Sequence, residues 1–262
     1  MLRRLLTVRW LGWLAALVLV SIACVLLGMW QWGRYEDKAA NADRVTAHYE
    51  ADPVGVSTVL GTDPMPIAKE WTRVRATGHY LPEQRQMVRN RPLDGTYGYE
   101  VLVPLRLDDG SVLVVDRGWV PNSPKGADVI PPVPPAPEGE VTVTGWLRQG
   151  EPSLERDMPA GQLASIRLPT VADRLGEPVL GGYLELQSED PDVPRPKALE
   201  APDTGTGPHL AYAIQWWLGP LGLGTFFVIA LRREVAGEQD GSERPARPPK
   251  PKKVRIWDEE DG

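Results

Sequence analysis

Two long apolar runs, one near each end of the chain, dominate the pattern of hydrophobic and polar positions. Residues 10–30 and 210–231 contain no charged side chain, and each run is a little over 20 residues long. At about 1.5 Å per residue, such a helix crosses a hydrocarbon core about 30 Å thick. The pattern predicts transmembrane helices at residues 10–32 and 209–231. The second carries Pro220 and three glycines, breaks that neighbouring helices in a membrane tolerate.

A cleaved signal peptide is the alternative interpretation of the first run. The start is basic, with Arg3, Arg4 and Arg9, but the apolar core is longer than the usual 7–15 or so residues. No small-x-small cleavage site followed by a polar stretch is present. Cys24 follows Ser-Ile-Ala, as at a lipoprotein site, yet apolar sequence continues past it. We therefore interpret the run as a retained helix.

The short flanks of the two helices predict their orientation. Residues 1–9 hold three arginines and no acid, and Arg232 and Arg233 directly follow the second run. Basic flanks favour the cytoplasmic side. Residues 33–208 carry 18 Lys and Arg against 27 Asp and Glu. The expected topology is a multi-pass protein of the cell membrane with both termini cytoplasmic and the central domain extracytoplasmic.

Between the apolar runs the pattern changes from helical to alternating. Residues 33–60 have few helix breakers before Pro53 and Gly55, which predicts a helical stalk. After Trp71 a period of two predicts seven short strands, at residues 72–81, 85–91, 98–107, 111–120, 140–149, 164–169 and 182–187. The expected fold is a membrane protein whose two transmembrane helices flank a mostly antiparallel β domain, barrel- or sandwich-like.

Turn and loop signals complete this picture. Asp-Asp-Gly within residues 105–115 predicts a β-hairpin, and residues 169–176 predict a short helix near Leu175. Residues 121–138 contain seven prolines and predict a long loop. Residues 232–262 are charged and Pro-rich, which predicts a disordered cytoplasmic tail.

Composition and motifs exclude some classes of function. The net charge of −6 argues against nucleic acid as a partner. Cys24, the only cysteine, lies inside the first apolar run, so the central domain has no disulfide. The motifs of zinc proteases, serine hydrolases and P-loop enzymes are missing. His48, His79 and His209 lie too far apart for metal-ligand spacing. The sequence gives no support for an enzyme.

His209 opens the second apolar helix directly after Gly207 and Pro208. Near the positive end of the helix dipole the neutral imidazole is favoured, which is the form that binds iron. His209, Tyr212 and Trp216 follow at i, i+3 and i+7 and share one stripe. Gln215 lies nearby, and a polar group at this depth usually faces protein or a cavity. The stripe is either an interfacial belt of aromatic anchors or part of a cofactor site.

The exit of the first helix has the same ambiguity. Trp30, Gln31 and Arg34 share a face if the helix continues. Arg34 either pairs with a carboxylate, such as a haem propionate, or extends toward lipid headgroups. Because this exit and His209 belong to the same outer leaflet, two helices that frame one domain can bring these side chains together.

A third motif, DRGWVP, ends a predicted strand at residues 116–121. Asp116 and Arg117 are adjacent and so point to opposite faces. We expect Arg117 to pair with a carboxylate elsewhere and Trp119 to close the end of the barrel. A packing corner formed by Arg117, Gly118 and Trp119 is the favoured interpretation.

In this order, the three motifs resemble those of the Surfeit locus protein 1 family. The pattern G-x-W-Q-x-x-R, here at residues 28–34, is matched at Gly28, Trp30, Gln31 and Arg34. R-G-W-V-P is matched at residues 117–121, and H-x-x-Y-A-x-x-W at residues 209–216. The resemblance also covers residues 89–105 and the two-helix layout. Asp116 and Gly207-Pro208 stand where the family often has Asn.

This resemblance implies an assembly factor that delivers haem a to, or stabilises it in, subunit I of haem-copper cytochrome c oxidase. It implies His209 as a candidate haem iron ligand, Arg34 near the propionates, and Trp30, Gln31, Tyr212 and Trp216 as further cofactor-binding residues. Expected partners are oxidase subunit I, other oxidase or respiratory supercomplex subunits and the lipid bilayer, with the haem a synthesis machinery as a further candidate. The alternatives are a scaffold or accessory subunit that never touches haem, and an extracytoplasmic ligand-sensing membrane protein.

Overall fold

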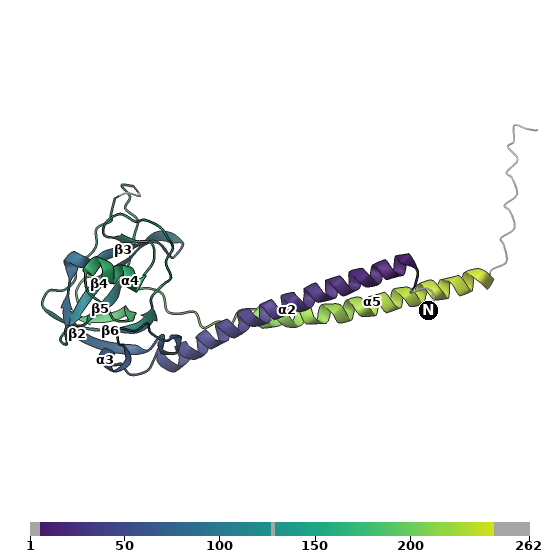
Figure 1. The fold of residues 1–262 in the computed structure, drawn as a ribbon, viewed down its shortest axis with the longest axis horizontal. Coiled ribbons are helices and arrows are strands. Elements are labelled where there is room, and N and C mark those ends of the chain that lie inside the picture. The colour runs from purple at the N-terminus through teal and green to yellow at the C-terminus, as the bar shows by residue number, and fades with distance from the viewer. Residues whose placement is uncertain (1–5, 127–128, 244–262) are drawn as a thin grey trace, which may run out of the picture. The chain divides into compact units, whose positions relative to one another are not determined.

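The computed structural model describes residues 6–126 and 129–243. The chain divides into two compact units, Met1–Glu36 with Gly207–Gly262, and Asp37–Thr206. The first contains most of helix α2 and helix α5, and the second contains the β-sheet (Figure 1). The boundary at Asp37 falls inside α2, so this helix contributes to both units.

The two terminal helices are α2 (Val8–His48) and α5 (His209–Glu243), with 41 and 35 residues. Both exceed the roughly 20 residues that cross a bilayer. In their most apolar stretches only 11% and 6% of the residues are buried, whereas the core helix of a soluble domain is mostly buried. Both are therefore candidate membrane helices, in agreement with the hydrophobic pattern.

Both helices extend differently from the prediction. The expected disordered tail is wrong for residues 232–243, which continue α5. This segment contains two Arg and three Glu, which are good helix formers, and no proline, although it also has two glycines. Residues 244–262 lie outside the described part. The stalk predicted at residues 33–60 is continuous only to His48, where α2 ends at an aromatic contact, and a separate helical turn follows at Val56–Val59.

That contact fixes the end of α2 to the sheet within the second unit. The Tyr49 ring stacks on Trp146 with centroids 4.2 Å apart and planes 4° apart. Trp146 Nε1 donates a hydrogen bond to the Tyr49 carbonyl at 2.9 Å. Val45 and Trp71 complete the buried cluster. These contacts hold the end of α2 against the sheet.

In the part of the second unit that the structure describes, eight strands and four short helices follow α2. The strands are β1 (Val54–Gly55), β2 (Arg73–Tyr80), β3 (Gln86–Leu93), β4 (Thr96–Leu107), β5 (Val112–Pro121), β6 (Glu140–Gln149), β7 (Gln162–Leu163) and β8 (Gly182–Asp190). The helices are α3 (Val56–Val59), η1 (Ile67–Lys69), η2 (Pro82–Gln84) and α4 (Leu168–Leu175).

Six of the seven predicted strands are confirmed, as is the short helix that ends at Leu175. The strand predicted at residues 164–169 is wrong, because Leu168 and Pro169 begin α4. Proline suits the first turn of a helix, where its missing N–H has no helical partner to lose. Between β5 and β6 the described residues form no helix or strand, as the seven prolines predict.

The sheet is mixed, with the order β1-β2-β6-β8-β5-β4-β3-β7 and a further β2–β4 pairing. Strands β2, β6, β8, β5 and β4 therefore form a closed circuit of hydrogen-bonded pairs. The predicted antiparallel character holds for five pairings, including the β4–β5 hairpin. Three pairings are parallel, among them β5–β8. The chain reaches β8 only after β6, β7 and α4, which permits the parallel approach.

Strand β5 is buried on both faces of the sheet. Leu113 and Val115 belong to the core enclosed by the strand circuit. Val112 and Val114 belong to a second core, covered by α4 through Leu168 and Val171. A continuous apolar run such as SVLVV is typical of a strand with two covered faces. The polar residues that follow it, Asp116 and Arg117, consequently enter buried surroundings.

Candidate functional site

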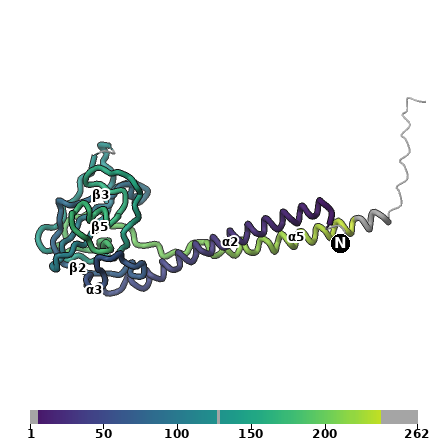
Figure 2. Tube along the Cα trace, in the orientation of Figure 1, coloured from purple at the N-terminus to yellow at the C-terminus, as the bar shows by residue number. Residues whose placement is uncertain are grey.

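Small residues allow α2 and α5 to approach closely within their unit. A Cβ atom built at Gly28 would lie 2.2 Å from Nε1 of Trp217, so only glycine leaves room for this ring. Ala213 is completely buried, and a Cβ atom at Gly219 would lie 3.4 Å from the Cys24 sulfur. Small residues at such contacts are typical of helices that pack in membranes. Figure 1 and Figure 2 both show α2 and α5 side by side.

One hydrogen bond joins the two helical motifs that the sequence singled out. Nδ1 of His209 lies 2.8 Å from Oε1 of Gln31, although 178 residues separate them in sequence. His209 is the first residue of α5, and Gln31 lies one turn beyond Gly28 on α2. No described residue forms a hydrogen bond with Nε2 of His209. Nδ1 of the imidazole is thus hydrogen-bonded to Gln31, whereas Nε2 has no hydrogen-bond partner among the described residues.

Aromatic contacts mark one side of this helix pair. The rings of Trp32 and Trp217 have centroids 5.9 Å apart. At about 100° per residue, Trp30 and Arg34 lie on the opposite side of α2 from Trp32. Tyr212 likewise lies on the opposite side of α5 from Trp217. Trp30, Arg34 and Tyr212 therefore share the second side of the pair.

The predicted residues on this second side are largely exposed. Trp30, Tyr212 and Trp216 have exposed fractions of 59%, 46% and 37%. Arg34 is exposed and makes no ion pair with any residue in the described ranges. Of the six predicted residues, His209 and Gln31 are the pair that forms a hydrogen bond. The other four, Trp30, Arg34, Tyr212 and Trp216, have exposed side chains.

The other end of the helix pair carries a second polar contact. Trp10 Nε1 donates to Oε1 of Glu234 at 3.3 Å, and Arg9 lies 3.6 Å from the same carboxylate oxygen. The Trp10 ring packs edge-on against Phe227. Glu234 belongs to the segment predicted to be disordered, and its contacts explain why α5 continues beyond Arg233.

The strand motif at residues 116–121 is built around a buried ion pair. Arg117 is 1% exposed and forms two bonds with Glu189, from Nη2 at 2.5 Å and from Nε at 3.1 Å. Tyr80 donates its hydroxyl to Glu189 at 3.0 Å, and the Pro134 carbonyl accepts from Arg117. Burial, together with the charge of Glu189, raises the pKa of Tyr80 well above 10. The group closes one end of the inner core.

The next two residues of the motif explain its glycine and tryptophan. Gly118 has a φ of +121°, and a Cβ atom there would lie 2.4 Å from the Lys197 carbonyl. Trp119 lies against Gly98 and donates Nε1 to the Arg91 carbonyl at 2.8 Å. Trp119 belongs to neither core cluster, so it packs beside the closed strand circuit and does not fill it.

Asp116 and its neighbours form a separate group of buried carboxylates. Asp116 pairs with Glu185 across the parallel strands β5 and β8. Its Oδ1 accepts from the Gly118 N–H at 3.0 Å, while Oδ2 has no partner among the described residues. Burial, with the charge of Glu100, raises the pKa of Asp116 well above its usual value. Burial thus favours the protonated form of this carboxyl.

Two arginines partly neutralise this group. Arg91 lies 2.9 Å from Glu100, and Arg148 lies 2.8 Å from Glu185. Burial raises the pKa of Glu100 to about 7 despite the Arg91 charge, and the Glu151 carboxylate adds to the effect. Burial also raises the pKa of Glu185. Carboxylates thus outnumber arginines in a poorly solvated region, and protons make up part of the difference.

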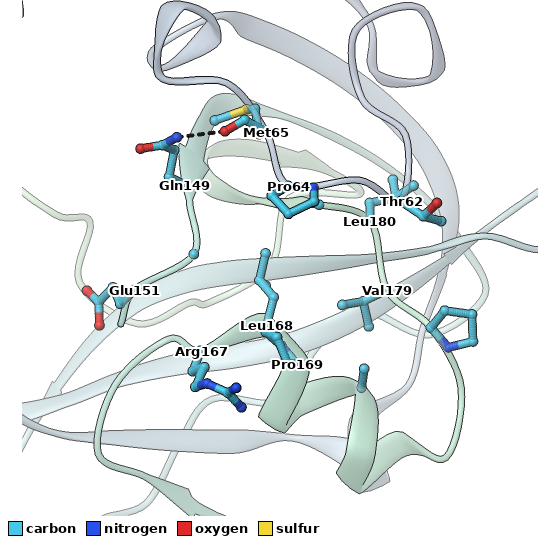
Figure 3. A pocket seen from close by; sticks show the side chains of 14 residues that line it. Thr62, Pro64, Met65, Gln149, Glu151, Arg167, Leu168, Pro169, Val179 and Leu180 are labelled. Atoms are coloured by element: carbon cyan, nitrogen blue, oxygen red, sulfur yellow. Dashed lines mark hydrogen bonds between the residues drawn. The ribbon is translucent and has the colours of Figure 1, made fainter. Parts of the chain in front are cut away.

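A pocket of about 440 Å³ lies between the start of α4 and the segment around Met65 (Figure 3). Its walls are mainly apolar, and its polar groups have partners. Gln149 donates to the Met65 carbonyl at 2.6 Å, Glu151 accepts from the Ile166 N–H, and Arg167 donates to Thr170. Within residues 6–126 and 129–243, no three His, Cys, Asp or Glu side chains are arranged to hold a metal ion.

Several residues of these sites were missed by the sequence pattern. Glu189 and Tyr80 complete the Arg117 group but lie 72 and 37 residues away. Trp32 and Trp217 form the aromatic contact between the helices. The helical spacing of the motifs had pointed to Trp30 and Trp216 instead. Four tryptophans within residues 30–32 and 216–217 were the available signal, since clusters of aromatic residues at two helix ends commonly pack together.

These features define a class: two candidate membrane helices, joined by a His–Gln contact, flank a mixed β domain with buried ion pairs. The SURF1 family profile matches residues 18–218, most of the chain. The chain belongs to the SURF1 family, and the resemblance seen in the three motifs is confirmed.

Relatives of this family cover the chain to different extents. A SURF1-like protein of Mycobacterium tuberculosis is 35% identical over 243 residues, which covers 86% of this chain and 88% of that protein. A SURF1-like protein of Dictyostelium discoideum is 34% identical over 111 residues, 40% of this chain and 41% of that protein. The cytochrome oxidase assembly protein SHY1 of Saccharomyces cerevisiae is 31% identical over 113 residues, 42% of this chain and 28% of that protein.

Proposed function

We propose that this chain is a membrane-anchored assembly factor for haem-copper cytochrome c oxidase, and that it holds haem a on the His209 side of the helix pair during maturation of subunit I. The 2.8 Å contact between His209 and Gln31 carries the proposal, because it joins the two helical motifs at one place. The yeast relative, named a cytochrome oxidase assembly protein, supports the broader part.

The residues present fit a haem group by their chemistry. Haem, when bound, would supply an iron, and His209 would hold that iron through an imidazole nitrogen. Nε2 of His209 is open for this role while Nδ1 is held by Gln31. Arg34, an exposed cation without an ion pair to a described residue, suits a propionate. Trp30, Tyr212 and Trp216 provide apolar surface beside them.

The exposed character of this surface supports transfer more than permanent storage. A cofactor that remains in place is usually enclosed, with most of its surface buried. Here the aromatic side chains are one-third to more than one-half exposed. A surface of this kind leaves one side of a bound group accessible to the acceptor, which in this proposal is oxidase subunit I.

Replacing His209 with Ala is expected to lower the haem a that co-purifies with the full-length protein at least about tenfold. The protein should remain in the membrane, because Gly28, Trp217 and Ala213 still pack the helices. The absorbance spectrum of protein purified from membranes that make haem a measures the effect. His79→Ala, an exposed histidine of the β domain, is the matched control. Unchanged haem content in His209→Ala, with oxidase subunits still bound, would instead support a scaffold that does not touch haem.

Membrane topology is the second part of the proposal, with both termini cytoplasmic and the β domain outside. In a Cys24→Ala background, single cysteines replace Tyr97, which is 62% exposed, or Gly237. A membrane-impermeant maleimide is expected to label intact cells at Tyr97→Cys, and Gly237→Cys only after lysis. The reverse pattern of labelling would place the β domain in the cytoplasm and contradict the proposed orientation.

A further inference from the structure

The contact between Gln31 and His209 constrains more than the distance between two helices. A neutral imidazole has one N–H donor and one bare nitrogen, and a glutamine amide can accept or donate. Two arrangements are therefore compatible with the 2.8 Å separation. Either Nδ1–H donates to the amide oxygen, or the amide NH₂ donates to a bare Nδ1. Nε2 is bare in the first arrangement and carries the proton in the second.

The surroundings of Nε2 decide between them. No described residue forms a hydrogen bond with Nε2, and the His209 side chain is half-buried in the helix pair. If Nδ1 were bare, Nε2–H would be a donor without a protein partner, whereas a bare Nε2 leaves only an acceptor unpaired. Among buried backbone groups, the unpaired donor is the rarer of the two. The oxygen of Gln31, which lies toward Nδ1, accepts in the favoured arrangement.

We infer that Gln31 is a positioning residue, which holds His209 in the Nδ1–H tautomer and leaves the Nε2 lone pair free for a metal. This inference deepens the proposed haem function and rests on it for the identity of the metal. Gln31 acts through His209 and does not itself contact the cofactor. A histidine ligand whose other N–H is held by an oxygen is oriented and made more basic.

The packing around Gln31 explains how an amide on another helix can hold the ring. Gly28, one turn earlier on α2, is covered by Trp217, two turns beyond His209 on α5. This contact fixes the spacing and rotation of the two helices at the level where the amide and the imidazole meet. The α2 motif therefore combines a glycine for the approach and a glutamine for the hydrogen bond.

The tautomer can be measured without any haem. Full-length protein labelled with ¹⁵N-histidine, in lipid nanodiscs at a pH where His209 is neutral, gives separate nitrogen signals that His209→Ala assigns. We expect a protonated Nδ1 and a bare Nε2 in the unaltered protein. Gln31→Leu should shift the population toward Nε2–H, whereas Gln31→Glu keeps an acceptor and should preserve Nδ1–H. Gln215→Leu, an exposed glutamine on α5, is the matched control and should change nothing.

A bare Nδ1 in the unaltered protein, or an unchanged tautomer in Gln31→Leu, would overturn the inference. The proposed function is tested separately by titrating the same proteins with ferric protoporphyrin IX and following the Soret band. Gln31→Leu should weaken binding about 10–100-fold, with affinity restored by Gln31→Glu. Failure of the unaltered protein to bind the porphyrin would remove the haem function but leave the tautomer result intact. Full affinity in Gln31→Leu would overturn the positioning role alone.

Discussion

Replacing Glu189 with Gln is expected to destabilise the β domain by about 3–5 kcal/mol. The carboxylate is completely buried, and it forms two bonds with the equally buried guanidinium of Arg117. Arg117 remains charged in any folded protein, so the variant leaves a cation in the core without its counter-charge. The amide keeps only one oxygen, so Arg117 and Tyr80 together lose one of the two atoms that accept their hydrogen bonds. Urea unfolding of the full-length protein in micelles, followed by tryptophan fluorescence, measures the loss.

Two further variants separate the buried charge from the shape of the side chain. Arg117→Met combined with Glu189→Leu removes both charges and is expected to recover most of the lost stability, because a buried ion pair adds little beyond an apolar pair of similar size. Arg106→Ala breaks the more exposed pair with Glu177 and should have a much smaller effect than Glu189→Gln. Equal effects of Glu189→Gln and Arg106→Ala would show that the Arg117 group is solvated.

The stability of the β domain is expected to fall as the pH rises from about 4.5 to about 7, through the contribution of Glu100. Burial raises the pKa of this carboxyl from 4.5 to about 7 in the folded protein. In this window the folded state binds more protons than the unfolded state, so raising the pH favours unfolding. Below about 4.5 the contribution is complete, and above about 7 it is lost. The shift corresponds to roughly 3 kcal/mol.

A difference measurement isolates this contribution from other titrating groups. Glu100→Gln keeps the shape but never ionises, so its stability relative to the unaltered protein should increase by roughly 3 kcal/mol between pH 4 and pH 8. Glu177→Gln is the control with the opposite sign, since a hydrogen bond from Arg106 lowers the pKa of Glu177. A constant difference between Glu100→Gln and the unaltered protein over this range would contradict the assigned pKa.

Both predictions concern the ionic groups around β5, a strand that is buried on both faces. Asp116 and Arg117 are neighbours in β5, and each meets a different ionic group because strand side chains alternate. Arg117 reaches Glu189 beside the inner core, whereas Asp116 meets Glu185 and Glu100 outside the strand circuit. The domain contains no disulfide, so these groups and the two apolar cores hold it together.

The local pattern of the sequence determined the elements of this protein. Apolar runs identified α2 and α5, and alternation identified six strands, because the backbone geometry of a helix or strand fixes the period at which buried positions recur. The motifs around Gln31, Arg117 and His209 were also visible, since unusual polar residues in apolar surroundings stand out. The failures were local conflicts: Pro169 started a helix in a run that alternates, and helix formers after Arg233 prolonged α5.

The tertiary structure alone decided which residues meet. Gln31 and His209 are 178 residues apart, and Arg117 and Glu189 are 72 apart. Neither partner follows from spacing, because each depends on how two helices rotate or which strands lie side by side. The parallel β5–β8 pairing, which buries Asp116 beside Glu185, is of the same kind. Periodicity specifies the face of each element, whereas the partner across that face is selected by the packing of the whole chain.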